Sequence, residues 1–183
     1  MLTDFENKNG FTLVELMTVV AIIGITAAIG AAGYGQGERR VVLDNQTFQF
    51  MQDVRRTQER ALSSRNIGAD TPRGYGVYLS HGGNYYLVYA DKNNSKDYDD
   101  PNEEIERISL DGKIMISDLQ GRQNNTPWTN ANSVDINYAA PDLTAQIVED
   151  TDKYEWARIV FSVVNGPQVR AAVINIAGLV YIE

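Results

Sequence analysis

The chain has no cysteine and one histidine among its 183 residues. Without cysteine it can form neither disulfides nor thiolate metal sites, and it lacks a thiol nucleophile. The histidine, His81, lies between two strand-like runs beside two glycines, a context typical of a turn. We find neither a glycine-rich phosphate loop after a strand nor a pair of carboxylates singled out by their spacing. The sequence therefore predicts that the protein is not an enzyme.

Positive charge is also scarce. The chain has 16 lysines and arginines against 24 aspartates and glutamates, a formal net charge of −8. An acidic surface repels phosphate backbones, so nucleic acid is not expected as a partner.

By contrast, a long apolar run occurs near the N-terminus. Between Phe11 and Tyr34 the only charged residue is Glu15. A helix of about 24 residues is roughly 36 Å long and can cross a hydrocarbon core of about 30 Å. Residues 11–37, which end in a glycine-rich patch, are therefore expected to form a membrane-spanning helix.

The carboxylate of Glu15 is unusual in such a helix. An ionisable group in a spanning helix costs about 3 kcal/mol on insertion scales and usually has a functional partner. If the chain were cut between Gly10 and Phe11, the new α-amine of Phe11 in a neighbouring subunit would supply a cation for Glu15. The pattern thus indicates that Glu15 acts in assembly.

The stretch Gly10–Leu16, with sequence Gly-Phe-Thr-Leu-Val-Glu-Leu, resembles the class III signal of type IV pilins and type II secretion pseudopilins. The resemblance implies that prepilin peptidase removes a leader of residues 1–10, cutting between Gly10 and Phe11, and N-methylates Phe11. It further implies a single-pass protein of the inner (cytoplasmic) membrane, with its globular domain outside the cytoplasm. The expected partners are other pilin or pseudopilin subunits and the inner-membrane assembly platform, and the product is a pilus or pseudopilus.

An alternative is an ordinary secretory signal peptide, cut near the small residues Gly30–Ala32, followed by a secreted α+β module that binds carbohydrate or calcium. The leader argues against it, because Asp4 and Glu6 outweigh Lys8, whereas a secretory signal begins with positive charge. The two hypotheses place the mature N-terminus at different residues.

Residues 38–183 are expected to form a globular α+β domain. The stretch 38–65 has the pattern of an amphipathic helix, and Phe48 is also expected to pack in the core. The apolar face of this helix comprises Leu43, Thr47, Phe50, Met51, Val54, Ala61 and Leu62. Residues 74–183 are mainly strand-like, so we expect the helix to cover one side of an antiparallel sheet.

Turn signals divide this region into strands. Two hairpins are predicted, one joining 74–79 to 85–89 across Gly82-Gly83 and the other joining 105–110 to 113–116 across Asp111-Gly112. A short strand is expected at 134–138, and a meander at 156–164, 169–176 and 179–182. Residues 118–132 and 141–154 are expected to be loops, with a helical turn at Leu143, Ile147 and Val148 as the alternative for the second. The layout is most similar to minor pseudopilins of the general secretion pathway H type.

One acidic segment, residues 91–104, could suit a cation. Asp91, Asn93, Asp97 and Asp99 alternate as in a calcium loop, and Ca²⁺ prefers such oxygen ligands. However, Lys96 stands where an EF-hand loop requires glycine, and Asn102 stands where a bidentate glutamate belongs. We therefore favour a solvated loop without a cofactor over a weak calcium site.

The hairpin at 74–89 is also rich in tyrosine. These rings could form a carbohydrate-binding platform, but aromatic cross-strand pairs that stabilise the sheet are the favoured interpretation.

Overall fold

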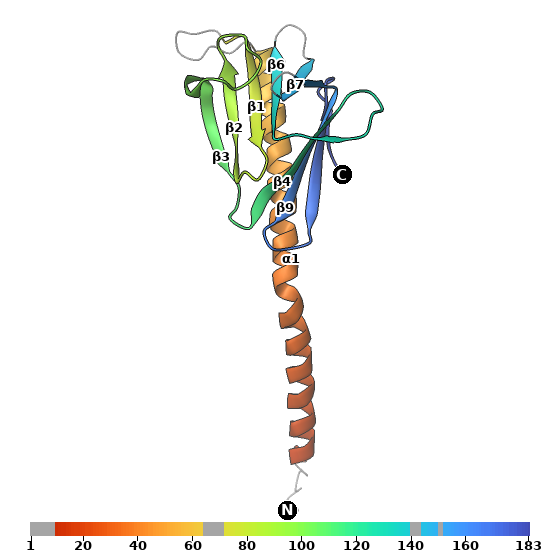
Figure 1. Cartoon of the computed structure of the whole chain (residues 1–183). Helices are drawn as coiled ribbons and strands as arrows, with labels where there is room; N and C mark the ends of the chain where they lie inside the picture. Colours follow the sequence, from red (N-terminus) through yellow and green to blue (C-terminus); the bar gives the residue numbers. More distant parts are fainter. Residues whose placement is uncertain (1–9, 64–71, 140–143, 150–151) are drawn as a thin grey trace, which may run out of the picture. The chain divides into compact units, whose positions relative to one another are not determined.

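The computed structural model describes residues 10–63, 72–139, 144–149 and 152–183, without the side chains of residues 31–36 (Figure 1). The chain divides into two compact units, one ending at Glu38 and the other running from Arg39 to Glu183. Each unit is described by itself below.

Helix α1 spans Leu13–Leu62 and contributes residues to both units. It begins two residues later than predicted, because Thr12 caps its N-terminus through its side chain. At the other end, Arg60 lies in the last turn, where a cation interacts favourably with the helix dipole. The predicted end at Arg65 lies outside the described residues.

The second unit contains two antiparallel sheets together with the part of α1 that follows Arg39 (Figure 1). The six-stranded sheet has the order β3-β2-β1-β6-β7-β8 and the five-stranded sheet the order β11-β10-β9-β4-β5. The strands of the first sheet are β1 (Gly74–Ser80), β2 (Tyr85–Asp91), β3 (Glu104–Ser109), β6 (Ser133–Ala139), β7 (Ala145–Glu149) and β8 (Asp152–Tyr154). Those of the second are β4 (Ile114–Arg122), β5 (Thr129–Asn130), β9 (Trp156–Val163), β10 (Val169–Asn175) and β11 (Val180–Ile182). A short 3-10 helix, η1 (Pro101–Glu103), precedes β3.

The α+β class predicted from the sequence is confirmed, but the strands form two sheets where one was expected. The first hairpin is confirmed, with β1 paired to β2 across the turn at Gly82-Gly83. The strand predicted at 134–138 is β6, which pairs with β1. The C-terminal meander is confirmed as β9, β10 and β11.

The second predicted hairpin is wrong. β3 pairs with β2 in one sheet, whereas β4 pairs with β9 and β5 in the other. The Asp111-Gly112 turn therefore carries the chain from one sheet to the other. Ile116 of β4 forms two backbone hydrogen bonds with the turn of the first hairpin. Its carbonyl accepts from the Gly82 N–H and its N–H donates to the Gly83 carbonyl, each over 2.9 Å. A local turn signal does not specify which strand lies alongside, and these non-local bonds decided the pairing.

Both predicted loops contain strands. β4 continues to Arg122 along β9, with β5 added beyond it, and the second loop contains β7 and β8. In β7, Ala145 and Ile147 are buried on one face, whereas Gln146 is half-buried and Val148 buried on the other, so both faces of this strand are largely covered. The apolar spacing of Leu143, Ile147 and Val148 did not distinguish this strand from a helical turn, and Leu143 lies outside the described residues.

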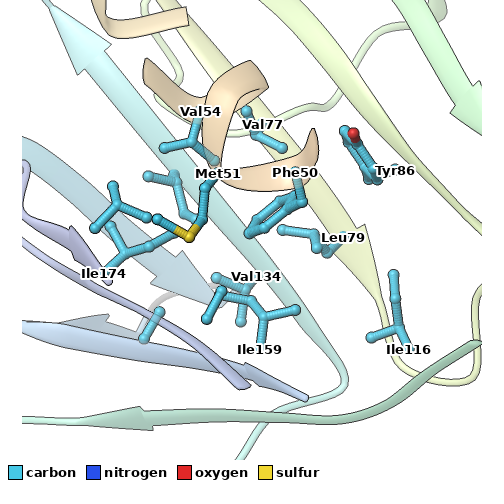
Figure 2. Close-up of a cluster of buried hydrophobic side chains, with 14 of the residues drawn as sticks. Phe50, Met51, Val54, Val77, Leu79, Tyr86, Ile116, Val134, Ile159 and Ile174 are labelled. Carbon is cyan, nitrogen blue, oxygen red and sulfur yellow. The ribbon is translucent and has the colours of Figure 1, made fainter. Parts of the chain in front are cut away.

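The core lies between the inner faces of the two sheets and one face of α1 (Figure 2). Phe50 joins all three, because its ring lies 5.2 Å from that of Tyr86 on β2 and 5.3 Å from that of Phe161 on β9. Each predicted helix-face residue from Leu43 to Ala61 is buried, but Leu62 is exposed. Phe48 is also exposed, contrary to prediction, because two residues correspond to about 200° around a helix and place it opposite Phe50.

Candidate processing and assembly site

The predicted cleavage bond lies just before the helix. Gly10 and Phe11 precede α1 and are exposed, and 87% of the Phe11 surface is accessible. A β-carbon on Gly10 would meet no atom within 4 Å. The bond between these residues therefore lies in accessible chain outside the hydrogen-bond ladder of the helix.

Thr12 and Glu15 together form a capping box at the start of α1. Thr12 Oγ1 accepts from the Glu15 N–H over 3.2 Å, and Glu15 Oε2 accepts from the Thr12 N–H over 2.9 Å. The Thr12 hydroxyl also donates to Glu15 Oε2 over 3.0 Å. This reciprocal arrangement satisfies two N–H groups that a helix start otherwise leaves without acceptors. The sequence analysis identified Glu15 as an assembly residue but missed its capping role, although Thr-x-x-Glu is the sequence signature of such a box.

The capping box uses only part of the Glu15 carboxylate. Both bonds from Thr12 go to Oε2, and Oε1 accepts none from the residues that the structure describes. A carboxylate oxygen thus remains available for a cation next to Phe11.

The helix beyond the box is suited to an apolar environment. Leu13–Gly30 has a mean hydropathy of 2.2, and none of it is buried within the protein. The hydroxyl groups of Thr18 and Thr26 donate to helix carbonyls at Glu15 and Ile22, each over 2.9 Å. In a medium without water such internal partners keep polar groups satisfied. This apolar helix with a prepilin-type start is consistent with membrane anchoring.

Asp91 and Asp99 of the acidic loop accept hydrogen bonds from within the loop. Asp91 is buried, and its carboxylate accepts from the N–H groups of Asn94 over 2.5 Å and Lys96 over 3.1 Å. The Asn93 amide donates to both oxygens of Asp99, over 2.9 and 3.0 Å. Among the described residues no group of three or more histidine or acidic side chains could hold a metal ion. The preference for a solvated loop over a weak calcium site stays a prediction.

Asp97, the remaining predicted ligand, has one buried oxygen, Oδ1, that accepts no hydrogen bond in the described structure. The neighbouring loop residue Tyr98 donates its N–H to Asp135 on β6 over 2.9 Å, and its ring lies 5.5 Å from that of Tyr78 on β1. The loop therefore lies against the six-stranded sheet and is not merely solvated.

Glu103 completes the attachment of this loop. It is buried, and its Oε1 accepts from the Lys92 N–H over 2.9 Å, whereas Oε2 has no partner among the described groups. Burial raises the pKa of Glu103, and the negative charges of Asp99 and Asp91 raise it further. Burial likewise raises the pKa of Asp91, against the lowering effect of its backbone hydrogen bonds. Composition alone could not separate these buried carboxylates from the exposed ones around them.

The tyrosines of the first hairpin are mostly internal. Tyr75, Tyr86 and Tyr89 are buried, and Tyr89 lies where a β-carbon on Gly76 would be. The packing interpretation therefore holds for these three residues, which offer no exposed stacking platform for a sugar.

Comparison with known proteins supports the N-terminal site. Residues 6–31 match the family described as the prokaryotic N-terminal methylation motif. The match contains Gly10, Phe11, Thr12 and Glu15, so the chain carries a type IV pilin-like prepilin signal. The comparisons with curated proteins and with solved structures gave no match.

Proposed function

We propose that the protein is a structural subunit, not an enzyme, of a type IV pilus or type II secretion pseudopilus. The observation that carries the proposal is an accessible Gly10–Phe11 bond, followed by the Thr12–Glu15 capping box and an exposed apolar helix, inside a matching methylation motif. In this proposal prepilin peptidase cuts after Gly10 and methylates the new amine of Phe11.

The same helix serves two states of the subunit. Leu13–Gly30 first holds the protein in the inner membrane, with the second unit outside the cytoplasm, and then packs with the helices of other subunits in the filament. The transfer replaces lipid contacts by contacts with equally apolar side chains, so the large apolar surface stays out of water in both states.

Glu15 aligns subunits during this transfer. The methylated Phe11 amine of one subunit remains a cation and pairs with Glu15 Oε1 of its neighbour, while Oε2 keeps its bonds to Thr12. A charge in an apolar medium is costly unless an opposite charge pairs with it. The pairing of Glu15 with the Phe11 amine therefore favours one axial offset between neighbouring helices. Assembly onto an inner-membrane platform belongs to the proposal as well. The arrangement of helix, acidic loop and terminal meander supports a minor subunit of the general secretion pathway H type.

The position of the mature N-terminus tests the cleavage step. Intact-mass and N-terminal peptide measurements on protein made in a host with prepilin peptidase should find a chain that begins at methylated Phe11. Gly10→Asp should leave the precursor uncleaved in the membrane, while Gly24→Ala, in the same apolar run, should be processed normally. A mature start near Gly33 would refute the proposal and support the secretory alternative.

Glu15→Ala tests the assembly step. This variant should be cleaved and should stay in the membrane, since removal of a charge does not weaken an apolar anchor, yet it should be missing from sheared filaments. Thr18→Ala, one turn further along α1, provides the matched control and should assemble. Normal incorporation of Glu15→Ala would contradict the ion-pair role.

A further inference from the structure

A groove of about 450 Å³ lies in the second unit, between α1 and the C-terminal strands. Asp44, Phe48, Met51 and Arg55 line its helix side. Their spacings of four, three and four place them on one stripe of the helix. The opposite wall comes from β11, including Val180 and Ile182. The groove is apolar in its middle, where Phe48 remains 54% exposed.

The length of the groove suits an extended chain. From Asp44 to Arg55 the helix rises about 16 Å at 1.5 Å per residue. At about 3.3 Å per residue, an extended segment of five residues covers the same distance. Gly178, just before β11, lies against Gln58 of the helix, so β11 starts near the Arg55 end and runs alongside the groove.

β11 is an edge strand, and of its groove-lining residues Val180 is buried whereas Ile182 is half-buried. The one neighbour of β11 among the described strands is β10. Glu183 and Ala171 exchange two hydrogen bonds, of 2.8 and 3.3 Å, and the Asn175 N–H donates to Leu179 over 3.1 Å. Because antiparallel strands alternate in this way, the N–H and C=O groups of Val180 and Ile182 point away from β10. Such an edge is a template for another strand.

The two ends of the groove differ in charge. At one end Asp44 and Arg170 form an ion pair of 2.7 Å. At the other end Arg55 is exposed and has no ion-pair or hydrogen-bond partner in the described part of the chain. The groove therefore presents one uncompensated positive charge in an otherwise acidic protein.

We propose that the groove binds an extended acidic segment of a partner protein, which adds a strand to β11. An apolar side chain of the segment packs between Phe48 and Ile182, a carboxylate pairs with Arg55, and the segment's backbone bonds the half-buried Ile182. Strand addition of this kind takes affinity from main-chain bonds and specificity from the pockets for alternate side chains. The inference goes beyond the proposed role in a filament and does not depend on cleavage at Gly10 or on Glu15.

The test uses the full-length chain in detergent micelles and a fluorescein-labelled seven-residue peptide of alternating valine and glutamate. Fluorescence anisotropy should show saturable binding, and the matching valine–lysine peptide should bind at least about tenfold more weakly because it meets Arg55 with like charge. Arg55→Gln should weaken binding of the acidic peptide about fivefold, the effect of a partly exposed charge pair. Arg39→Gln, elsewhere on the helix, should leave it unchanged.

Two measurements then locate the added strand. Hydrogen exchange at the Ile182 amide should slow by about tenfold or more with saturating peptide, since this N–H gains an acceptor. Both Ile182→Pro and Ile182→Ala remove the isoleucine side chain. Ile182→Pro also removes the backbone N–H, which β10 does not use, whereas Ile182→Ala keeps it. Binding should fall further for Ile182→Pro than for Ile182→Ala.

Several results would overturn the proposal. These are equal binding of the two peptides, unchanged exchange at the Ile182 amide, or equal affinities of the two Ile182 variants. Self-association of the chain without peptide, abolished by Ile182→Pro in sedimentation experiments, would show that a second copy occupies the groove instead of an acidic partner.

Discussion

The hydroxyl of Tyr86 on β2 donates a 2.6 Å hydrogen bond to the carboxylate of Asp53 on α1. Asp53 is almost completely buried, and its other oxygen lies 3.2 Å from Arg56. Burial, together with the hydrogen bond and charge of Asp53, raises the pKa of Tyr86 well above its ordinary value. Tyr86 therefore stays protonated and fastens the helix to the six-stranded sheet through a charge-assisted bond.

Removing the Tyr86 hydroxyl should weaken this attachment. Tyr86→Phe leaves the ring packed but deprives a buried carboxylate of its donor, so we expect a loss of about 1 to 3 kcal/mol in the free energy of unfolding. Urea unfolding measures the change, with Tyr181→Phe on the exposed side of β11 as control. An equal loss in the two variants would show that the bond to Asp53 contributes nothing.

The position of Phe50 between both sheets makes it the most sensitive residue on the helix. Phe50→Ala should cost about 3 to 5 kcal/mol, because it removes a buried ring that contacts Tyr86 and Phe161 and leaves a cavity. Phe48→Ala removes the same side chain from an exposed position two residues away and should cost less than about 1 kcal/mol. Thermal or urea unfolding that ranked the two variants in the opposite order would reverse the assigned faces of α1.

We expect the stability of the fold to depend on Asp91 of the acidic loop but not on calcium. Asp91→Ala leaves the N–H groups of Asn94 and Lys96 without their acceptor. It should lower the free energy of unfolding by about 1 to 3 kcal/mol in EDTA. Asp91→Asn keeps one oxygen acceptor and should cost less. Thermal unfolding in EDTA, Ca²⁺ and Mg²⁺ at matched ionic strength should show no calcium-specific shift. A rise of several degrees with calcium alone, removed by Asp91→Ala combined with Asp99→Ala, would establish a metal site.

Glu103 should make stability depend on pH in a defined direction. Its pKa is raised in the folded protein, so the folded state holds the proton more tightly than the unfolded chain. The stabilisation from Glu103 is therefore present at low pH and is lost as pH rises through the folded pKa. Glu103→Gln keeps the acceptor for Lys92 N–H and lacks this proton. The free energy of unfolding of the unmodified protein minus that of Glu103→Gln should increase from pH 7 to pH 4.

Parallel pH profiles for the two proteins would contradict this assignment. If the free energy of unfolding of the unmodified protein minus that of Glu103→Gln grew with rising pH, the ionised carboxylate would be the form that the fold stabilises. Urea unfolding across this pH range distinguishes the three outcomes.

The sequence alone determined the N-terminal site and the class of fold. A capping pair and an apolar run act over neighbouring residues, so Thr12, Glu15 and Leu13–Gly30 specify a helix start and its apolar length without reference to the rest of the chain. The same holds for the first hairpin, where the Gly82-Gly83 turn sets two adjacent strands side by side, and for the meander after Trp156.

Only the tertiary structure decided which strands became neighbours and which carboxylates were buried. The Asp111-Gly112 turn has the local signature of a hairpin, yet β3 pairs with β2 and β4 pairs with β9, so the two strands lie in different sheets. Likewise Asp91, Glu103 and Asp135 are buried, and each accepts a backbone N–H that the folded chain brings to it. The sheet to which β4 belongs and the burial of these carboxylates depend on residues distant in the chain, whose contacts neither the local turn signal nor the composition encodes.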